Sequence, residues 1–277
     1  IRYGGNKLHL IVNSNEKECE WFVDDCSLEG YINNLLFKKD AGVDKAVPAW
    51  TKKCLDYKGV QAVWRLYDKN KAIVPLYFVD SGQDAAYAVV VEVDKKDNVV
   101  YWDQIGKVQF DSQDEFETIN KDKIEWYDSL DFEFERQEYE RVLEMTWINE
   151  TLIQLNNFHS VLDKNSCASL VSSLKRDGVQ ILEKHLQEYN QLLMDVYVTE
   201  ELVNPLKDLI RKPSEYERLS IYFKTVELMW KYGNTDIMNV LEVTVLENLY
   251  YEDEIWESFC KGYTGEFADF LSRWEPI

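Results

Sequence analysis

The sequence has 277 residues, of which 45% are hydrophobic and 14% aromatic, so it can bury a core in each of two ordinary domains and is not expected to be disordered. Its formal net charge of −20 disfavours binding to nucleic acid or to anionic lipid. The longest apolar run, residues 85–91, is far shorter than the roughly 20 residues that span a bilayer, and no signal-peptide pattern opens the chain, so we expect a soluble protein.

The first elements are predicted to be a hairpin and a helix. Residues 7–13 and 18–23 combine β-branched and aromatic residues and flank a polar Asn-Ser-Asn turn, which is typical of two paired strands. Ser27 then provides a helix N-cap, and the apolar residues that follow recur at spacings of 3, 1, 3 and 1, which line one helical face. This helix is expected to end near Lys39.

The next segments are predicted to contain a short helix and three antiparallel strands. The helix is placed at residues 50–55, before Gly59. The strands are placed at residues 73–79, 86–93 and 99–102. Short polar connections separate them, and such connections join neighbouring antiparallel strands.

Two signals follow the three strands. Ser112-x-x-Glu115 is a capping box, which predicts a short helix over residues 113–121. Residues 131–135 alternate as Asp-Phe-Glu-Phe-Glu, and a strand would send both rings to one face and the three carboxylates to the other. A helix is the alternative for this segment.

From Arg136 the pattern becomes helical, and we place a domain boundary there. The predicted fold class is α+β: an α/β domain with a mainly antiparallel sheet at residues 1–135, followed by an all-helical domain at residues 136–277. The helix limits in the second domain are predicted from N-caps at Ser166 and Thr199, a capping box at Ser214-x-x-Glu217, a left-handed stop at Gly233, a cap at Asn234 or Thr235, and two last helices at residues 252–260 and 265–273.

The sequence carries no recognisable catalytic constellation. His9, His159 and His185 lie in different predicted elements without zinc-binding spacing, and His185-x-x-Glu188 alone is best interpreted as an ordinary surface pair. Glycine-rich phosphate loops and the nucleophile elbow are also missing, and carboxylate pairs are not diagnostic among 51 Asp and Glu residues. We therefore predict that the protein is not an enzyme and has no metal or cofactor.

The cysteines favour a reducing compartment. Their number is odd and no Cys-x-x-Cys pair occurs among Cys19, Cys26, Cys54, Cys167 and Cys260. Reduced and mostly buried thiols in a cytoplasmic protein are therefore expected.

The acidity of the chain is concentrated in one segment. Residues 101–150 carry 15 acidic and 5 basic residues, a net charge of −10, whereas residues 1–100 carry 15 and 14. Acids in the first turn of the helix predicted after Ser112 are explained by the helix dipole alone. The remaining acids are interleaved with aromatic residues, a combination that suits a surface for a basic protein, where carboxylates steer the encounter and rings act as anchors.

The candidate partner-binding residues come from this segment: Asp111, Glu125, Trp126, Tyr127, Asp128, Asp131, Glu133, Glu135 and Glu138. The alternative interpretation is a solvated acidic face whose aromatic side chains belong to the core.

Four consecutive segments carry a resemblance to a known family. They are a strand at residues 74–82 that ends in Asp-Ser-Gly, a strand at residues 86–93, a strand at residues 98–103 that closes on Val-x-x-Trp-Asp, and a Ser-led helix start with Phe at residues 111–116. This order resembles the later half of the SMI1/KNR4-like domain of the SUKH superfamily. The residues 47–50 match the family's Leu-Pro signature only in part, and the opening hairpin departs from the family pattern.

The resemblance implies a function. Bacterial members of that superfamily are understood as immunity proteins, which bind and neutralise toxins, many of them nucleases. It implies inhibition by complex formation, with no turnover. The acidic surface adds the prediction that the toxin is a basic protein, and the charge predicts no nucleic acid and no membrane as partner. The stretch from Ser214 also looks like helical modules at the ends of uncharacterised bacterial proteins. The alternative is an interaction scaffold whose helical domain grips a peptide or a partner helix.

Overall fold

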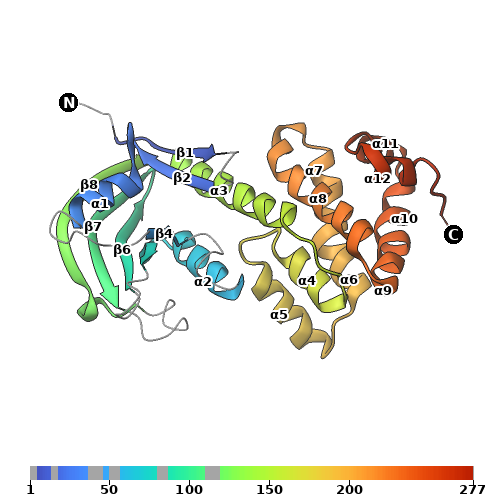
Figure 1. Ribbon diagram of the computed structural model, residues 1–277, viewed down its shortest axis with the longest axis horizontal. Helices are drawn as coiled ribbons and strands as arrows, with labels where there is room; N and C mark the ends of the chain where they lie inside the picture. The colour runs from blue at the N-terminus through green and yellow to red at the C-terminus, as the bar shows by residue number, and fades with distance from the viewer. Residues whose placement is uncertain are drawn as a thin grey trace. The chain divides into compact units, whose positions relative to one another are not determined.

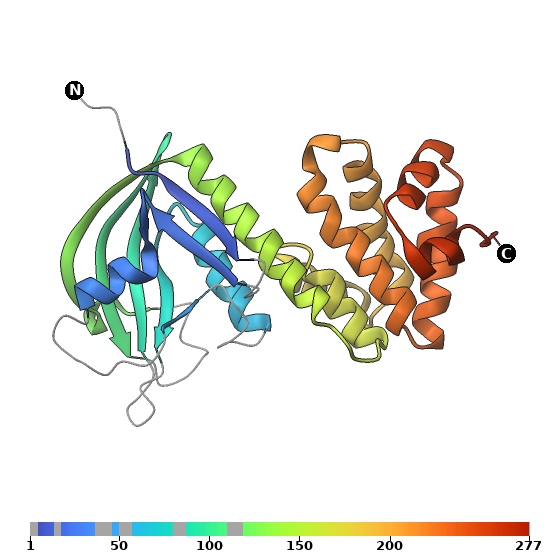
Figure 2. The ribbon, with the colours of Figure 1, turned by 45° about the horizontal axis from the view of Figure 1, so that its top comes forward.

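The computed structural model describes residues 5–13, 18–36, 46–49, 57–79, 87–109 and 119–276, and it divides into two compact units, residues 1–150 and 151–277. The first unit contains antiparallel sheets and the second is helical, so the predicted α+β fold class is confirmed (Figures 1 and 2). We call them the N-terminal unit and the helical unit.

A small sheet opens the N-terminal unit. Strands β1 (Leu8–Asn13), β2 (Glu18–Val23) and β3 (Cys26–Ser27) pair antiparallel in the order β1-β2-β3, which confirms the predicted hairpin. Helix α1 (Leu28–Leu36) follows, and the Ser27 hydroxyl accepts a hydrogen bond from the Gly30 amide at 3.2 Å, as expected of its N-cap. The predicted continuation of this helix to Lys39 lies outside the described residues.

A five-stranded antiparallel sheet forms most of the N-terminal unit. Its spatial order follows the chain, and its strands are β4 (Ala46–Pro48), β5 (Lys71–Val79), β6 (Tyr87–Lys96), β7 (Val99–Gln109) and β8 (Glu125–Glu135). Strand β6 continues through the segment that polarity predicts to be a connection, residues 94–98, of which only Asp97 and Asn98 form the turn. The charged residues 94–96 are tolerated in the strand because each has an ion-pair partner.

Helix α2 (Tyr57–Asp68) covers one face of this sheet (Figure 1). Gly59 lies in its first turn, where the amides have no intrahelical acceptor in any case, and does not end a helix. The helix predicted at residues 50–55 lies outside the described residues. So does most of the helix predicted at residues 113–121, but its end is wrong: Asn120 is not helical and caps a short 3₁₀ turn, η2 (Lys121–Lys123).

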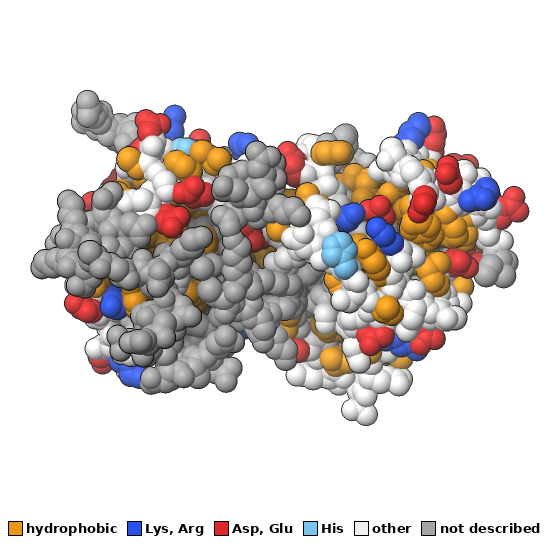
Figure 3. Space-filling view, in the orientation of Figure 1, with side chains coloured by type: hydrophobic (Ala, Val, Ile, Leu, Met, Phe, Trp, Pro, Cys, Tyr) orange, Lys and Arg blue, Asp and Glu red, His pale blue; other side chains and the backbone are white. Residues whose placement is uncertain are grey.

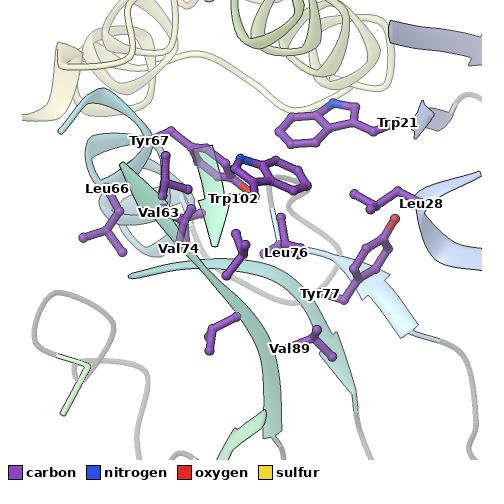
Figure 4. Packing of buried hydrophobic residues seen from close by; sticks show 14 of the residues in the cluster. Trp21, Leu28, Val63, Leu66, Tyr67, Val74, Leu76, Tyr77, Val89 and Trp102 are labelled. Carbon is purple, nitrogen blue, oxygen red and sulfur yellow. The ribbon is translucent and has the colours of Figure 1, made fainter. Parts of the chain in front are cut away.

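The core of the N-terminal unit lies between α2, the small sheet and the large sheet. Figure 4 shows Trp21 of β2 above Tyr67 of α2 and Trp102 of β7. All three side chains are fully buried. The Trp21 indole donates a hydrogen bond to the Thr146 hydroxyl at 2.8 Å, which ties the small sheet to helix α3 (Arg136–Asn156).

Helix α3 begins at the residue where the domain boundary is predicted, and the two compact units divide within it, after Glu150. Its first half packs on the sheet through Tyr139, Leu143 and Trp147. The helix therefore belongs to the N-terminal unit over most of its length.

The helical unit contains a succession of short helices. They are α4 (Lys164–Ser172), α5 (Gly178–Tyr189), α6 (Met194–Val198), the π-helix η3 (Thr199–Val203), α7 (Asn204–Ile210), the 3₁₀ turn η4 (Pro213–Glu215), α8 (Tyr216–Tyr232), α9 (Thr235–Asn239), the π-helix η5 (Val240–Leu246), α10 (Glu247–Tyr250), α11 (Asp253–Lys261) and α12 (Gly265–Leu271).

The predicted helix ends in this unit are partly right. Asn234 caps α9, and the last two helices are confirmed with small shifts of their ends. The N-cap of α4 is Asp163, and Ser166 is its capping-box partner. Thr199 is no cap, because helix continues without a break from α6 into η3. The capping box at Ser214 is not formed either, since Pro213–Glu215 make a 3₁₀ turn before α8.

Gly233 ends α8 in an extended conformation, with φ −62° and ψ 135°, instead of the predicted left-handed one. Its backbone forms an isolated parallel bridge with Leu162, whose amide bonds to the Tyr232 carbonyl at 2.8 Å. A Cβ at this position would lie 2.3 Å from the Met229 carbonyl oxygen. Glycine is needed here for close packing of the backbone.

Candidate functional site

The alternating acidic segment is a strand, as predicted. In β8 the rings of Phe132 and Phe134 turn toward the core, where Phe134 packs 5.1 Å from Trp102 between ring centres. Asp131, Glu133 and Glu135 are exposed. The period of two in the sequence therefore places the carboxylates on the solvent side, and the helical alternative is wrong.

Strand β8 is an edge strand of the large sheet (Figure 2). The backbone amide of Glu133 points outward from the sheet and donates to the side-chain oxygen of Asn6 at 3.1 Å. Gly5 lies against the same residue, since an added Cβ would be 2.6 Å from the Glu133 carbonyl oxygen. The chain thus covers this edge at Glu133 with its own backbone and an amide side chain, which protects that part of the strand from pairing with another strand.

Among the other predicted site residues, the carboxylates and the aromatic rings differ in exposure. Glu125 and Glu138 are exposed, whereas Trp126 and Tyr127 are half-buried and pack against the core. Asp111 and the side chain of Asp128 lie outside the described residues. The structure thus distributes the described carboxylates along β8 and the start of α3. It turns the rings mainly inward, in agreement with the alternative interpretation of the aromatic residues.

Two of the predicted site residues have local structural roles. The Glu135 carboxylate accepts a hydrogen bond from the Glu138 amide at 3.2 Å, so it caps the first turn of α3. Asp131 has a positive φ of 49°, a conformation that aspartate tolerates better than most residues. In contrast, Glu125, Glu133 and Glu138 form no ion pair with any residue that the structure describes. These three carboxylates are available to a partner.

A buried ion pair lies beneath this surface, and sequence reasoning missed it. The Lys95 side chain is 1% exposed, and its ammonium lies 2.5 Å from the carboxylate of Glu140 and 5.5 Å from the centre of the Tyr139 ring. On the opposite face of the sheet Asp94 pairs with Lys96 at 2.8 Å, and hydrogen bonding to Lys96 lowers the pKa of the Asp94 carboxyl. Only the alternation of β6 through residue 96 could have indicated that Lys95 points inward.

The histidines have structural surroundings. His185 is buried, accepts a hydrogen bond from the Leu193 amide at 3.3 Å and contacts two tyrosine rings. His9 stacks on Phe22. Within the ranges that the structure describes, no three His, Cys, Asp or Glu side chains lie close enough to hold a metal ion. No helix in this part of the chain is long and apolar enough to cross a bilayer.

The described cysteines are free thiols in different environments. Cys26 is exposed, whereas Cys19 and Cys167 are buried. Burial raises the pKa of the Cys167 thiol to about 12. Burial, and then the nearby Glu150 carboxylate, raises the pKa of the Cys19 thiol. The thiolate is the reactive form of cysteine. Both buried thiols are therefore protected from modification, because reagents cannot reach them and because their raised pKa values disfavour the thiolate.

We expect maleimide to modify Cys26 rapidly in the folded protein at neutral pH, and Cys19 and Cys167 only after addition of denaturant. Peptide mass spectrometry of protein labelled with and without denaturant measures this directly. Equal labelling of Cys26 and Cys167 in the folded protein would contradict the burial described here.

The helical unit has a hydrogen bond between a helix and a π-helix. The Thr244 hydroxyl of η5 donates to the Asp195 carboxylate of α6 at 2.8 Å, and a shallow cavity of about 380 Å³ lies beside it, lined also by residues of η3. Figure 3 shows charged side chains of both signs and exposed apolar side chains on the surface of this unit. π-Helical segments often occur at functional sites, but their presence has no sequence signal.

The comparisons with known proteins concern the helical unit. A family described only as a domain of unknown function, DUF7674, matches residues 170–268, which include both π-helical segments. No curated protein and no solved structure matches the chain. The family description names no activity.

Proposed function

We propose that this protein is a cytoplasmic immunity or inhibitor protein that binds a basic bacterial toxin, with a nuclease as the favoured toxin class. It acts by forming a complex and performs no turnover. The observation that supports the proposal is the row of exposed carboxylates on β8 and the start of α3, in which Glu125, Glu133 and Glu138 have no ion-pair partner among the described residues.

The electrostatics of such a surface fit a nuclease. A nuclease active site is basic because it must hold phosphate, and a carboxylate-rich face competes for the same charges. Carboxylates held on a strand cost little to order on binding, because the backbone that carries them is already fixed in the sheet. Such charges chiefly accelerate association, and salt screens their effect.

A charge variant tests the surface. We expect Glu125→Lys, Glu133→Lys and Asp131→Asn together to lower the association rate for the toxin by about tenfold or more at low ionic strength, and to weaken its salt dependence. Glu135 is left in place because it caps α3. The partner is first captured from lysate of the source organism at low salt, identified by mass spectrometry and purified for surface plasmon resonance.

The control variant, Glu188→Lys, Glu275→Lys and Asp269→Asn, makes the same change in net charge at exposed positions of the helical unit. It should retain most of the association rate, because its charges lie on another surface. Equal kinetics of the β8 variant and the wild type would remove β8 from the interface. Capture of a salt-resistant partner would favour the scaffold alternative instead.

A further inference from the structure

The small sheet has an edge strand beside a groove. Strand β1 is the outer strand of the order β1-β2-β3. A groove of about 470 Å³ lies between β1 and α3, lined by Leu8, Leu10 and Val12 of the strand and by residues of the helix, among them Arg141, Val142 and Met145. Both walls belong to the N-terminal unit.

The hydrogen-bond register leaves the backbone of β1 available on the groove side. The Lys7 carbonyl accepts from the Asp24 amide at 2.7 Å, so this pair faces inward, toward β2. Because inward and outward groups alternate along an antiparallel strand, the amides and carbonyls of Leu8, Leu10 and Val12 point away from β2. These three residues line the groove together with His9, and no described residue forms a hydrogen bond with their outward groups.

The charges around the groove differ from those of the rest of the chain. Two basic residues, Lys7 and Arg141, line it against a single acid, Glu138, in a protein with a net charge of −20. Neither Lys7 nor Arg141 forms an ion pair with a described residue. The walls between these cations are apolar. An occupant with carboxylates and alternating apolar side chains would complement both properties.

We propose that the β1 edge binds an extended acidic segment of a partner protein, which adds to the small sheet as a strand. The outward amides and carbonyls of β1 supply the main-chain hydrogen bonds, and the groove takes alternate apolar side chains of the segment. Lys7 and Arg141 pair with its carboxylates. A second copy of this chain is less suitable, since it would bring another Lys7, His9 and Arg141 to the same groove. The acidic strand β8 has no part in this site.

A fluorescent peptide tests this site without knowledge of the natural partner. The probe is a capped six-residue peptide in which Glu and Val alternate, and its binding to the full chain is measured by fluorescence anisotropy. We expect saturable binding, and an equivalent peptide with Lys in place of Glu should bind at least about tenfold more weakly. N-methylation of alternate amides of the Glu peptide should abolish binding, because it removes main-chain donors.

Variants of the protein locate the site. Leu10→Pro removes one outward amide and is compatible with an edge strand, and we expect it to weaken binding by about tenfold. Arg141→Glu should act similarly through charge. Ile11→Thr changes an exposed side chain of β1 whose amide faces β2, so it should leave affinity unchanged. Circular dichroism checks that each variant folds, and the N-methylated peptide supplies the same test if Leu10→Pro does not.

Three results would overturn the proposal. The first is equal binding of the Glu and Lys peptides, and the second is unchanged binding to Leu10→Pro. The third is concentration-dependent dimerisation in analytical ultracentrifugation that Leu10→Pro abolishes, because the edge would then pair with a second copy. If the β8 charge variant binds the toxin more weakly but binds the Glu peptide as the wild type does, the β1 site does not depend on the β8 carboxylates, although Glu138 lies near both sites.

Discussion

Replacing Trp102 with alanine is expected to lower the free energy of unfolding of the N-terminal unit by about 3–5 kcal/mol. The Trp102 side chain is fully buried, and its ring lies 5.1 Å from that of Phe134, 6.2 Å from that of Tyr139 and 6.3 Å from that of Trp21. The substitution removes the ring that connects the large sheet, the small sheet and α3, and these elements cannot all move to fill the cavity.

Urea denaturation followed by circular dichroism and by tryptophan fluorescence measures the loss. Tyr251→Ala is the matched control, since it removes an aromatic ring that is 72% exposed and should change stability by less than about 0.5 kcal/mol. Trp102→Phe should lie between the two. A loss below about 1 kcal/mol for Trp102→Ala would show that the ring is not central to this core.

Glu140→Ala is expected to destabilise the same unit by about 3 kcal/mol, because it leaves the Lys95 ammonium buried without its carboxylate. The carboxylate side chain is 34% exposed, so water can reach part of the pair and the loss falls at the lower end of the range for buried ion pairs.

The double variant Lys95→Met with Glu140→Leu separates the effect of the unpaired charge on stability from the effect of lost packing. It replaces both partners by apolar groups of similar length, so we expect it to regain most of the stability that Glu140→Ala loses. Glu257→Ala removes the partner of Lys261 on an exposed helix surface and should have little effect. If the double variant were as unstable as Glu140→Ala, the unpaired ammonium could not be the cause.

Local signals predicted much of the fold. The hairpin and strands β5, β6 and β7 follow from apolar segments and from turn residues, and the alternation in β8 follows from a period of two. Strand β4 was not predicted. Some errors are local, such as the cap of α4, which is Asp163 and not Ser166. Others arise from structure that the local sequence does not show. Gly233 is extended because Leu162 pairs with it, and Thr199 lies within a helix because α6 continues into a π-helix. Neither contact has a local pattern.

The candidate site likewise has features that the local sequence pattern predicted and features that it did not. Alternation predicted that Asp131, Glu133 and Glu135 would face solvent. Glu135 caps α3 because the strand ends where the helix begins. Asn6 covers the Glu133 amide because two segments far apart in the sequence lie side by side. The groove beside β1 combines a strand and a helix from distant parts of the sequence, so no spacing could reveal it.

The buried ion pair has a consequence for strand alignment. Strand β6 is buried on both faces from Tyr87 to Val91, so its apolar residues do not distinguish one face from the other. A slip of one residue would place Asp94 or Lys96 beneath α3 in place of Lys95. Lys95 would then face away from Glu140, and Asp94 would lie near Glu140 and repel it. The inward-facing Lys95 therefore helps to fix the register of β6 against its neighbouring strands. In most sheets the hydrophobic pattern sets this register.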